Sequence, residues 1–304
     1  MRHKPATDTG KLGTERRNPK TRRLDARSAL EIARIINDED AKVARAVRAA
    51  LPQIARAIDA IADAFSQGGR LIYVGTGTSG RLGALDAAEC PPTFNTDPKR
   101  VQFVIAGGMK ALGAAVEANE DSQETGRADI AKRKPGKHDV VIGASASGRT
   151  PYTVAAVEHA RLCGALTVGI ACNRGSPLER AADIPIVVEV GPEVITGSTR
   201  MKAGTAEKMV LNMLSTGAMA RLGYVYGNLM ANARLKNSKL VERGIRIVQQ
   251  ATGLDRNQSV TALRRSGGSV PVAIVMVKRN VARPRAEHLL KEAKGHIRAA
   301  LRDA

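Results

Sequence analysis

Short apolar runs alternate with segments of helical spacing through most of the chain. Five of these runs have the length and the apolar character of buried strands; they lie at residues 71–74, 101–106, 139–144, 166–171 and 184–188. Strands that alternate with helices at this spacing indicate a parallel, doubly wound sheet with helices on both faces. The sequence therefore predicts an α/β fold around a five-stranded parallel sheet, with ligands beyond the carboxyl ends of the strands.

Apolar residues at helical spacing predict the helices that flank this sheet. A short helix is expected at residues 30–36, a longer one at 43–65, and others up to 115, at 152–163 and up to 222. The helix that follows the first strand is expected to end at Pro91 and Pro92, because proline interrupts helical hydrogen bonding. Residues 242–303 are predicted as a small helical appendix, with one strand-like run at 272–277.

The distribution of charge divides the chain into three predicted parts. The net charge is +19; residues 1–24 hold 8 Lys and Arg against 2 acidic residues, and residues 234–304 hold 16 against 5. We predict a basic, mobile segment at 1–24, a main domain at 25–235 and a basic helical subdomain at 236–304. Basic ends favour weak polyanion contacts, but no zinc-finger or aromatic RNA-binding motif accompanies them. We interpret them as solvated charge and expect no nucleic-acid partner.

Composition indicates the cellular setting. No apolar run has the length of a membrane span, and charged residues occupy the N-terminus where a signal peptide needs an apolar segment. The three cysteines have an odd count and lack metal-ligand spacing, which fits free thiols in a reducing compartment. We therefore expect a cytoplasmic protein with no membrane association and no bound metal.

Two loops rich in glycine and hydroxyl groups follow predicted strands. The first, GTGTSG at residues 75–80, can present backbone N–H groups and the Ser79 hydroxyl to an anion at the positive end of a helix. It lacks the Lys-Ser/Thr ending of a P-loop. The second places Ser145, Ser147 and Thr150 on one strand-to-helix turn. Both are candidate phosphate sites; the alternatives are an ordinary glycine-rich turn and a helix cap.

Two glutamates are candidates for acid and base chemistry. Glu89 lies ten residues after Ser79, about 15 Å along a helix with a rise of ~1.5 Å per residue. It therefore serves a ligand anchored by another loop or by another subunit, if it is catalytic. Glu120 belongs to an acidic group at residues 117–121, and two such groups near one sheet edge can supply an acid and a base. The alternatives are a helix-end carboxylate and an acidic surface turn.

A series of motifs spans about residues 14–253. They are TERRNP at 14–19, RIINDED at 34–40, GRLIYVGTGTSGRLG at 69–83, DAAECPPT at 86–93, AGG at 106–108, EDS at 120–122, ASGRTPY at 146–152, GSTRMKAGT at 197–205, LNMLST at 211–216 and GNLM at 227–230. In these segments the chain resembles the N-acetylmuramic acid 6-phosphate etherases, which belong to the sugar isomerase (SIS) fold group. ECPPT and STRMKAGT are long and unusual, which excludes chance agreement.

The resemblance implies a cytoplasmic homodimer of SIS fold without a metal or an organic cofactor. It implies cleavage of the lactyl ether of N-acetylmuramic acid 6-phosphate, which yields N-acetylglucosamine 6-phosphate and D-lactate. It carries over Glu89 as the proton donor and Glu120 as the second active-site residue. We expect a carboxylate base to remove the C2 proton of the opened sugar while a carboxylic acid protonates the departing ether oxygen. One glutamate must then be neutral and the other ionised.

Separate side chains are expected to hold the two anionic groups of the substrate, and those at the phosphate are expected by analogy with other SIS-fold sugar-phosphate enzymes. The residues expected at the 6-phosphate are Ser145, Ser147 and Thr150, with Ser79 nearby. The residues expected at the lactyl carboxylate, from charge alone, are Arg200 and Lys202. Ser145 departs from the family sequence, which is usually closer to GIAAS where this chain has GASAS.

Two other functions stay open at this point. A sugar-phosphate-sensing regulator, similar to the glucokinase regulatory proteins, would bind the sugar phosphate without turnover. Those proteins are normally longer and have two SIS domains, whereas this chain has one. An aldose–ketose isomerase would need its own base arrangement, and neither ECPPT nor NEDS belongs to that pattern.

Overall fold

The computed structural model describes residues 10, 12–116, 119–235 and 237–302. The described chain forms two compact units, one from Met1–Ala87 and Lys99–Leu214 and the other from Ala88–Pro98 and Ser215–Ala304. This division differs from the predicted boundary at residue 235, because the second unit begins within a helix and also takes in residues 88–98. Residues 1–9 and 11 of the predicted basic segment lie outside the described residues.

A parallel sheet of five strands, counted over the described residues, forms the centre of the first unit. Its strands are β1 (Leu71–Gly75), β2 (Val101–Ile105), β3 (Val140–Ala144), β4 (Leu166–Ala171) and β5 (Ile184–Val187). Their order is β2-β1-β3-β4-β5, and Gly75 pairs with both Ile105 and Ala144, so three carboxyl ends lie level. The predicted fold class is confirmed, and each predicted strand boundary lies within one residue.

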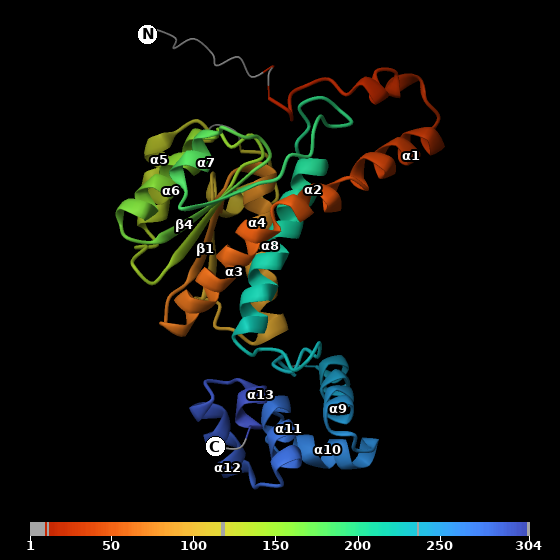
Figure 1. The fold of residues 1–304 in the computed structure, drawn as a ribbon, viewed down its shortest axis with the longest axis vertical. Coiled ribbons are helices and arrows are strands. Elements are labelled where there is room, and N and C mark those ends of the chain that lie inside the picture. The colour runs from red at the N-terminus through yellow and green to blue at the C-terminus, as the bar shows by residue number, and fades with distance from the viewer. Residues whose placement is uncertain (1–9, 11, 117–118, 236, 303–304) are drawn as a thin grey trace. The chain divides into compact units, whose positions relative to one another are not determined.

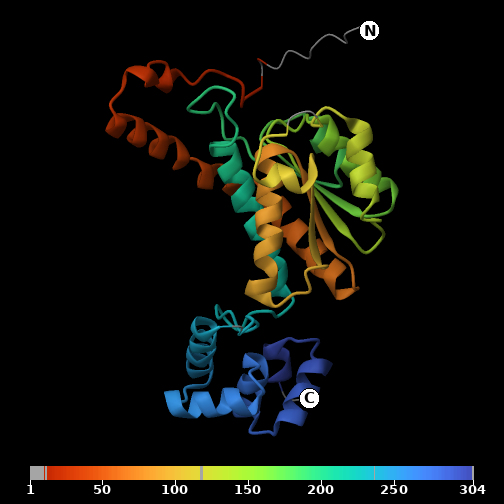
Figure 2. The same ribbon diagram turned by 180° about the vertical axis from the view of Figure 1, so that it is seen from behind.

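Helices cover both faces of this sheet (Figures 1 and 2). One face carries α5 (Gln123–Ala131), α6 (Pro151–Leu162) and α7 (Pro177–Ala181). The other carries α3 (Leu51–Ser66), α4 (Gly77–Phe94) and α8 (Lys202–Arg221). Ile72 and Val141 on the strands pack with Val157 and Leu178 on α6 and α7 in a buried aliphatic cluster. Each such side chain stabilises the fold by about 1.5–3 kcal/mol on burial.

The chain before the sheet is more broken than its pattern predicts. Helix α1 spans Ala29–Asp40. The prediction of a single helix at 43–65 is wrong, because the chain forms α2 (Val43–Ala49) and α3, with an interruption at Ala50. Pro52 lies in the first turn of α3 and has no N–H to continue the hydrogen bonds of α2. Within the segment predicted as mobile, Thr14 and Asn18 are buried, so this part of it is packed within the first unit.

Two helix predictions around the site loops are also wrong. α4 does not end at Pro91 and Pro92 but runs to Phe94. Its last turn is closed by the Asn95 N–H, which donates to the Pro91 carbonyl at 3.0 Å. The residues after β2 form a 3-10 turn, Gly108–Leu112, where a helix up to residue 115 was predicted. Directly after α4, the Arg234 side chain donates to Asn95 Oδ1 at 2.6 Å.

The second unit is helical in its described C-terminal part. It contains α9 (Ser238–Thr252), α10 (Arg256–Arg265), α11 (Val270–Arg279), α12 (Arg283–Glu292) and α13 (Ile297–Ala300). The prediction of a strand-like run at 272–277 is wrong, because these residues lie in α11. Ser269 caps this helix, and Pro271 lies in its first turn. The sequence of this helix is apolar on most sides because neighbouring helices bury it.

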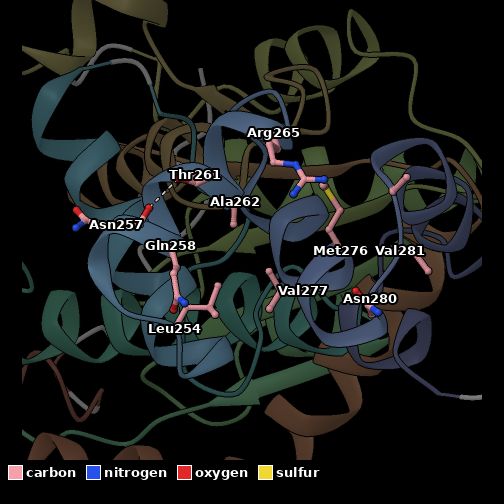
Figure 3. A pocket seen from close by; sticks show the side chains of 11 residues that line it. Leu254, Asn257, Gln258, Thr261, Ala262, Arg265, Met276, Val277, Asn280 and Val281 are labelled. Carbon is pink, nitrogen blue, oxygen red and sulfur yellow. Dashed lines mark hydrogen bonds between the residues drawn. The ribbon is translucent and has the colours of Figure 1, made fainter.

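A cavity of about 700 Å³ lies between α10 and α11 in this unit (Figure 3). Its polar lining includes Asn257, Gln258 and Arg265, and its apolar lining includes Met276 and Val277. The two hydroxyl loops and Glu120 belong to the other unit, whereas Glu89 belongs to this one. Among the described residues, no helix combines the length and the apolarity that crossing a membrane requires.

Candidate active site

The turn between β1 and α4 brings a carboxylate to a helix N-terminus. Gly77 begins α4 with a φ of +49°, and the backbone N–H groups of a first helical turn lack partners within the helix. A Cβ atom at Gly77 would lie 3.3 Å from Glu120 Oε1. The glycine therefore leaves room for the predicted second active-site glutamate beside the first hydroxyl-rich loop.

The backbone of Glu120 is tied to the second hydroxyl-rich loop. Its carbonyl accepts the N–H of Tyr152, in the first turn of α6, at 3.1 Å. Ser122 then caps α5 by accepting the Thr125 N–H at 3.1 Å. On α4, the Arg81 guanidinium holds the segment before Glu120 by donating to the carbonyls of residues 111 and 114 at 2.8 and 2.7 Å. Glu120 therefore contacts both the first loop and the first turn of α6, although 40 residues of sequence separate it from the first loop.

Three hydroxyls of the second loop are joined to one another. Ser145 Oγ lies 3.3 Å from Ser147 Oγ and 2.9 Å from Thr150 Oγ1, and it accepts the Gly148 N–H at 3.2 Å. Ser145 is buried, whereas Ser147 and Thr150 are partly exposed. Gly148 has a φ of +67°, and a Cβ there would lie 2.4 Å from the Ser176 hydroxyl. Ser145, which departs from the family sequence, therefore stabilises this loop through hydrogen bonds on its buried side.

A buried carboxyl on α8 holds the first loop. Ser79 Oγ lies 2.9 Å from Glu207 Oε1, and both side chains are buried. Burial raises the pKa of Glu207 to about 8, although the hydrogen bond from Ser79 opposes this shift. The Cys172 thiol, just after β4, faces the same region, and burial followed by the charges of Glu207 and Glu193 raises its pKa. We did not predict Glu207; the available signal was that it is the single acidic residue of α8.

A second buried acid, Glu193, caps α8. It accepts the backbone N–H groups of Lys202 and Ala203 at 3.0 and 2.9 Å. Burial raises the pKa of Glu193, and these two backbone hydrogen bonds partly offset the effect. Nearby, Asn173 after β4 donates to the Thr14 hydroxyl at 3.0 Å, which brings the TERRNP motif to the sheet edge. These contacts link segments that no local pattern connects.

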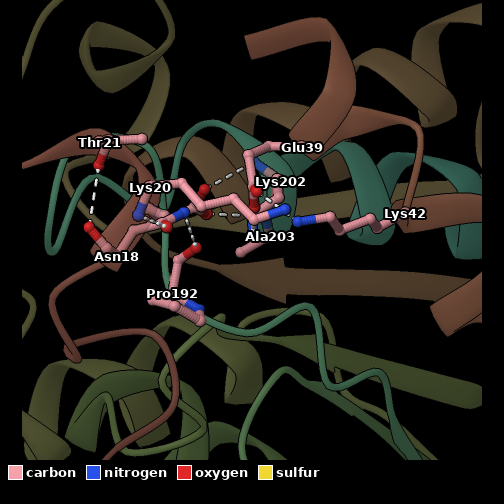
Figure 4. A network of polar contacts seen from close by, with 9 residues as sticks. Asn18, Lys20, Thr21, Glu39, Lys42, Pro192, Lys202 and Ala203 are labelled. Carbon is pink, nitrogen blue, oxygen red and sulfur yellow. Dashed lines mark hydrogen bonds and ion pairs between the residues drawn. The ribbon is translucent and has the colours of Figure 1, made fainter. Parts of the chain in front are cut away.

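Lys202 lies in a buried ion pair within the chain (Figure 4). Its ammonium group contacts Glu39 Oε2 at 2.7 Å, and Lys42 contacts the other oxygen of the same carboxylate. Burial disfavours the charge on Glu39, but both lysines outweigh that effect and lower its pKa to about 2. The Lys202 charge is thus compensated by Glu39, and the geometry gives no support to its expected role at the lactyl carboxylate. Arg200, three positions after Gly197, is exposed.

Glu89 lies on the exposed side of α4, directly before buried Cys90. It belongs to the segment Ala88–Pro98 of the second unit, whereas Glu120 and the hydroxyl loops belong to the first. Twelve positions separate Glu89 from Gly77 in sequence, about 18 Å along a regular helix. As for metals, the residues that the structure describes contain no group of three or more His, Cys, Asp or Glu arranged to hold an ion.

Comparisons with known proteins place these motifs in a family. The profile of the glucokinase regulatory protein N-terminal SIS domain matches residues 53–161, and that of the SIS domain matches residues 134–217. The chain is 54% identical to the N-acetylmuramic acid 6-phosphate etherase of Streptomyces avermitilis, over 95% of this chain and 93% of the relative. The chain belongs to the N-acetylmuramic acid 6-phosphate etherase family. This confirms the resemblance inferred from the motifs.

A second etherase and a solved structure are also similar to this chain. The N-acetylmuramic acid 6-phosphate etherase 1 of Vibrio cholerae is 49% identical over 97% of this chain and 98% of the relative. A solved phosphoheptose isomerase from Francisella tularensis is also similar, at 15% identity and a TM-score of 0.49, over 64% of this chain and 100% of that chain. The two etherase matches span 95% and 97% of this chain.

Proposed function

We propose that this protein is a carbon–oxygen lyase that cleaves N-acetylmuramic acid 6-phosphate into N-acetylglucosamine 6-phosphate and D-lactate. The observation that carries the proposal is the 54% identity to an etherase over nearly the full length of both chains. The position of the Glu120 carboxylate beside Gly77 at the α4 N-terminus, and of its backbone at the first turn of α6, supports it. A base held there can act on a sugar whose phosphate is bound at the same edge of the sheet.

Glu120 acts as the base and Glu89 as the acid. In the ring-opened sugar, the C1 aldehyde acidifies the C2 proton, which Glu120 removes. The C3–O bond breaks, Glu89 gives a proton to the lactate oxygen, and an unsaturated aldehyde remains. Water then adds its hydroxyl at C3 and a proton at C2, which completes the hydrolysis without an external oxidant or reductant.

The phosphate binds at the second loop. Ser147 and Thr150 are accessible and lie at the N-terminus of α6, where hydroxyls and the helix dipole favour an anion. Ser145 supports them from beneath. Ser79 contributes a further hydroxyl from the first turn of α4. Exposed Arg200 is assigned to the lactyl carboxylate, whereas Lys202 is left to its ion pair with Glu39.

The protein acts as a homodimer, and a second copy supplies Glu89 to the site. The helical distance of about 18 Å between Gly77 and Glu89 is too long for one chain's Glu89 to protonate the ether of a sugar held against Glu120. Helix α1 offers a surface for the second copy. Its Leu30 is 60% exposed, and Ile32, Ile35 and Ile36 are partly exposed on the same helix.

Release of D-lactate from N-acetylmuramic acid 6-phosphate by the purified protein tests the activity. We expect release by the wild type and a large loss in Glu89→Gln and Glu120→Gln. The match to the glucokinase regulatory protein SIS domain favours a second candidate, a regulator that binds sugar phosphates. Saturable binding of the sugar phosphate without lactate release by the wild type would establish that function instead.

A further inference from the structure

We propose that Glu207 is a positioning residue that directs the Ser79 hydroxyl proton toward the bound sugar phosphate. The inference rests on the proposed function in one respect, namely that the ligand lies beside Ser79. It concerns a residue outside both glutamate motifs and 128 positions away from Ser79 in sequence. Glu207 does not touch the substrate in this proposal; it acts through Ser79.

The packing of α8 on α4 fixes this contact. At Gly204, a Cβ atom would lie 3.4 Å from the Thr78 side chain, so the first turns of the two helices are in close contact. Glu207 follows three positions later, on the same face of α8, and reaches Ser79 at 2.9 Å. Glu207 is 1% exposed and Ser79 is 9% exposed. The acid is therefore sealed inside the protein, while the serine keeps some access to the sheet edge.

The protonation state of Glu207 decides which atom donates in this hydrogen bond. A carboxylate can only accept, so an ionised Glu207 takes the single Ser79 proton. A neutral carboxylic acid can donate to Ser79 Oγ, and the Ser79 proton is then free for an anionic ligand. Neutral Glu207 also avoids repulsion between a buried carboxylate and the phosphate.

The surroundings of Glu207 favour its neutral form near pH 7. Burial is the dominant influence and raises its pKa to about 8. The Cys172 thiol after β4 feels the charges of both Glu207 and Glu193. The Lys202 ammonium, which acts on Glu193, is itself paired with Glu39. Above pH 8, ionisation of Glu207 turns the hydrogen bond around and removes Ser79 as a donor.

The test measures the Kd of N-acetylglucosamine 6-phosphate by calorimetry between pH 6.5 and 9.5. For the wild type we expect about tenfold weaker binding at pH 9.5 than at pH 7, since a hydrogen bond to a charged group has this magnitude. In Glu207→Gln the amide N–H₂ donates at all pH values, so binding stays tight and this alkaline loss disappears. Glu207→Ala weakens binding about tenfold at pH 7, and Lys208→Gln, an exposed neighbour on α8, behaves as the wild type.

A double mutant separates positioning from a general structural role. In a Ser79→Ala background, Glu207→Ala should weaken binding no further, because the hydroxyl that it orients is gone. An equal alkaline loss in the wild type and Glu207→Gln, or an undiminished effect of Glu207→Ala in the Ser79→Ala background, would overturn the inference. Because binding is measured without turnover, an absence of lactate release with this pH dependence intact would refute the etherase activity alone.

Discussion

The carboxylate of Glu120 lies against the backbone of Gly77, where a Cβ atom would stand 3.3 Å from Glu120 Oε1. We expect Gly77→Ala to lower kcat at least about tenfold, because a methyl group would displace the base by a few tenths of an ångström and misplacement on the ångström scale costs about a hundredfold. The φ of +49° adds strain. Gly253→Ala is the matched control, since Gly253 has a φ of +79° with no atom within 4 Å. Equal kinetics of the two variants would contradict the placement of Glu120.

Deuterium exchange separates the roles of the two glutamates. With N-acetylmuramic acid 6-phosphate in D₂O, Glu89→Gln should still exchange the C2 proton, because its base is intact, but should release lactate about 10²–10⁴-fold more slowly. Glu120→Gln should lose both exchange and release. Mass spectrometry of recovered sugar measures the exchange. Exchange in Glu120→Gln but not in Glu89→Gln would reverse the assignment.

Subunit complementation tests whether a second copy supplies Glu89. Glu89→Gln and Glu120→Gln should each have very low activity alone. A mixture after subunit exchange should regain activity, because mixed dimers contain one site with both glutamates. Glu120→Gln mixed with a Glu89→Gln, Glu120→Gln double variant is the control. Recovery no greater than in this control would place both glutamates of each site on one chain.

The partly exposed isoleucines of α1 predict a charge-sensitive dimer. Ile35→Glu should shift the protein to monomers in light scattering and abolish lactate release, because a carboxylate would be desolvated at the interface. Arg34→Glu changes an exposed neighbour on the same helix and should leave the oligomeric state unchanged. A dimeric Ile35→Glu would show that the second copy docks elsewhere.

The buried pair of Lys202 and Glu39 predicts an effect on stability. Lys202→Met should lower the free energy of unfolding by about 3 kcal/mol, because it leaves a buried carboxylate with one partner fewer. The lowered pKa of Glu39 stabilises the fold above its unfolded value of 4.5, and this contribution is lost as pH falls toward about 2. Urea unfolding from pH 6 to 2 should show a smaller acid loss in Lys202→Met. Exposed Arg200→Met is the control.

The raised pKa of Glu207 predicts the opposite dependence of the free energy of unfolding on pH. Its pKa rises from 4.5 to about 8 on folding, so the folded state holds the extra proton between these values. The free energy of unfolding therefore falls as pH rises from 4.5 to 8, and the contribution is flat above 8. Glu207→Gln removes this slope, and the stability of the variant relative to the wild type should increase from pH 5 to pH 8. Parallel stability curves for the two proteins would contradict the buried, neutral state of Glu207.

The strands could be predicted to within one residue because a buried strand is a local run of apolar side chains. The hydroxyl loops were visible for the same reason, since glycines and serines at a strand end are read along the chain. The positions where helices begin and end were harder to predict. The interruption at Ala50 and the continuation of α4 through Pro91 depend on which neighbours replace or forgo a backbone hydrogen bond.

Sequence alone determined the sheet, the two loops, the glutamate motifs and the family to which they belong. Only the tertiary structure decided what these parts contact: Glu120 at Gly77, Glu207 on Ser79, and Lys202 in an ion pair with Glu39, 163 positions away. Strand and turn patterns follow from near neighbours along the chain. The charge state and the partner of a buried acid follow from the desolvation and the side chains that folding brings to it from distant segments.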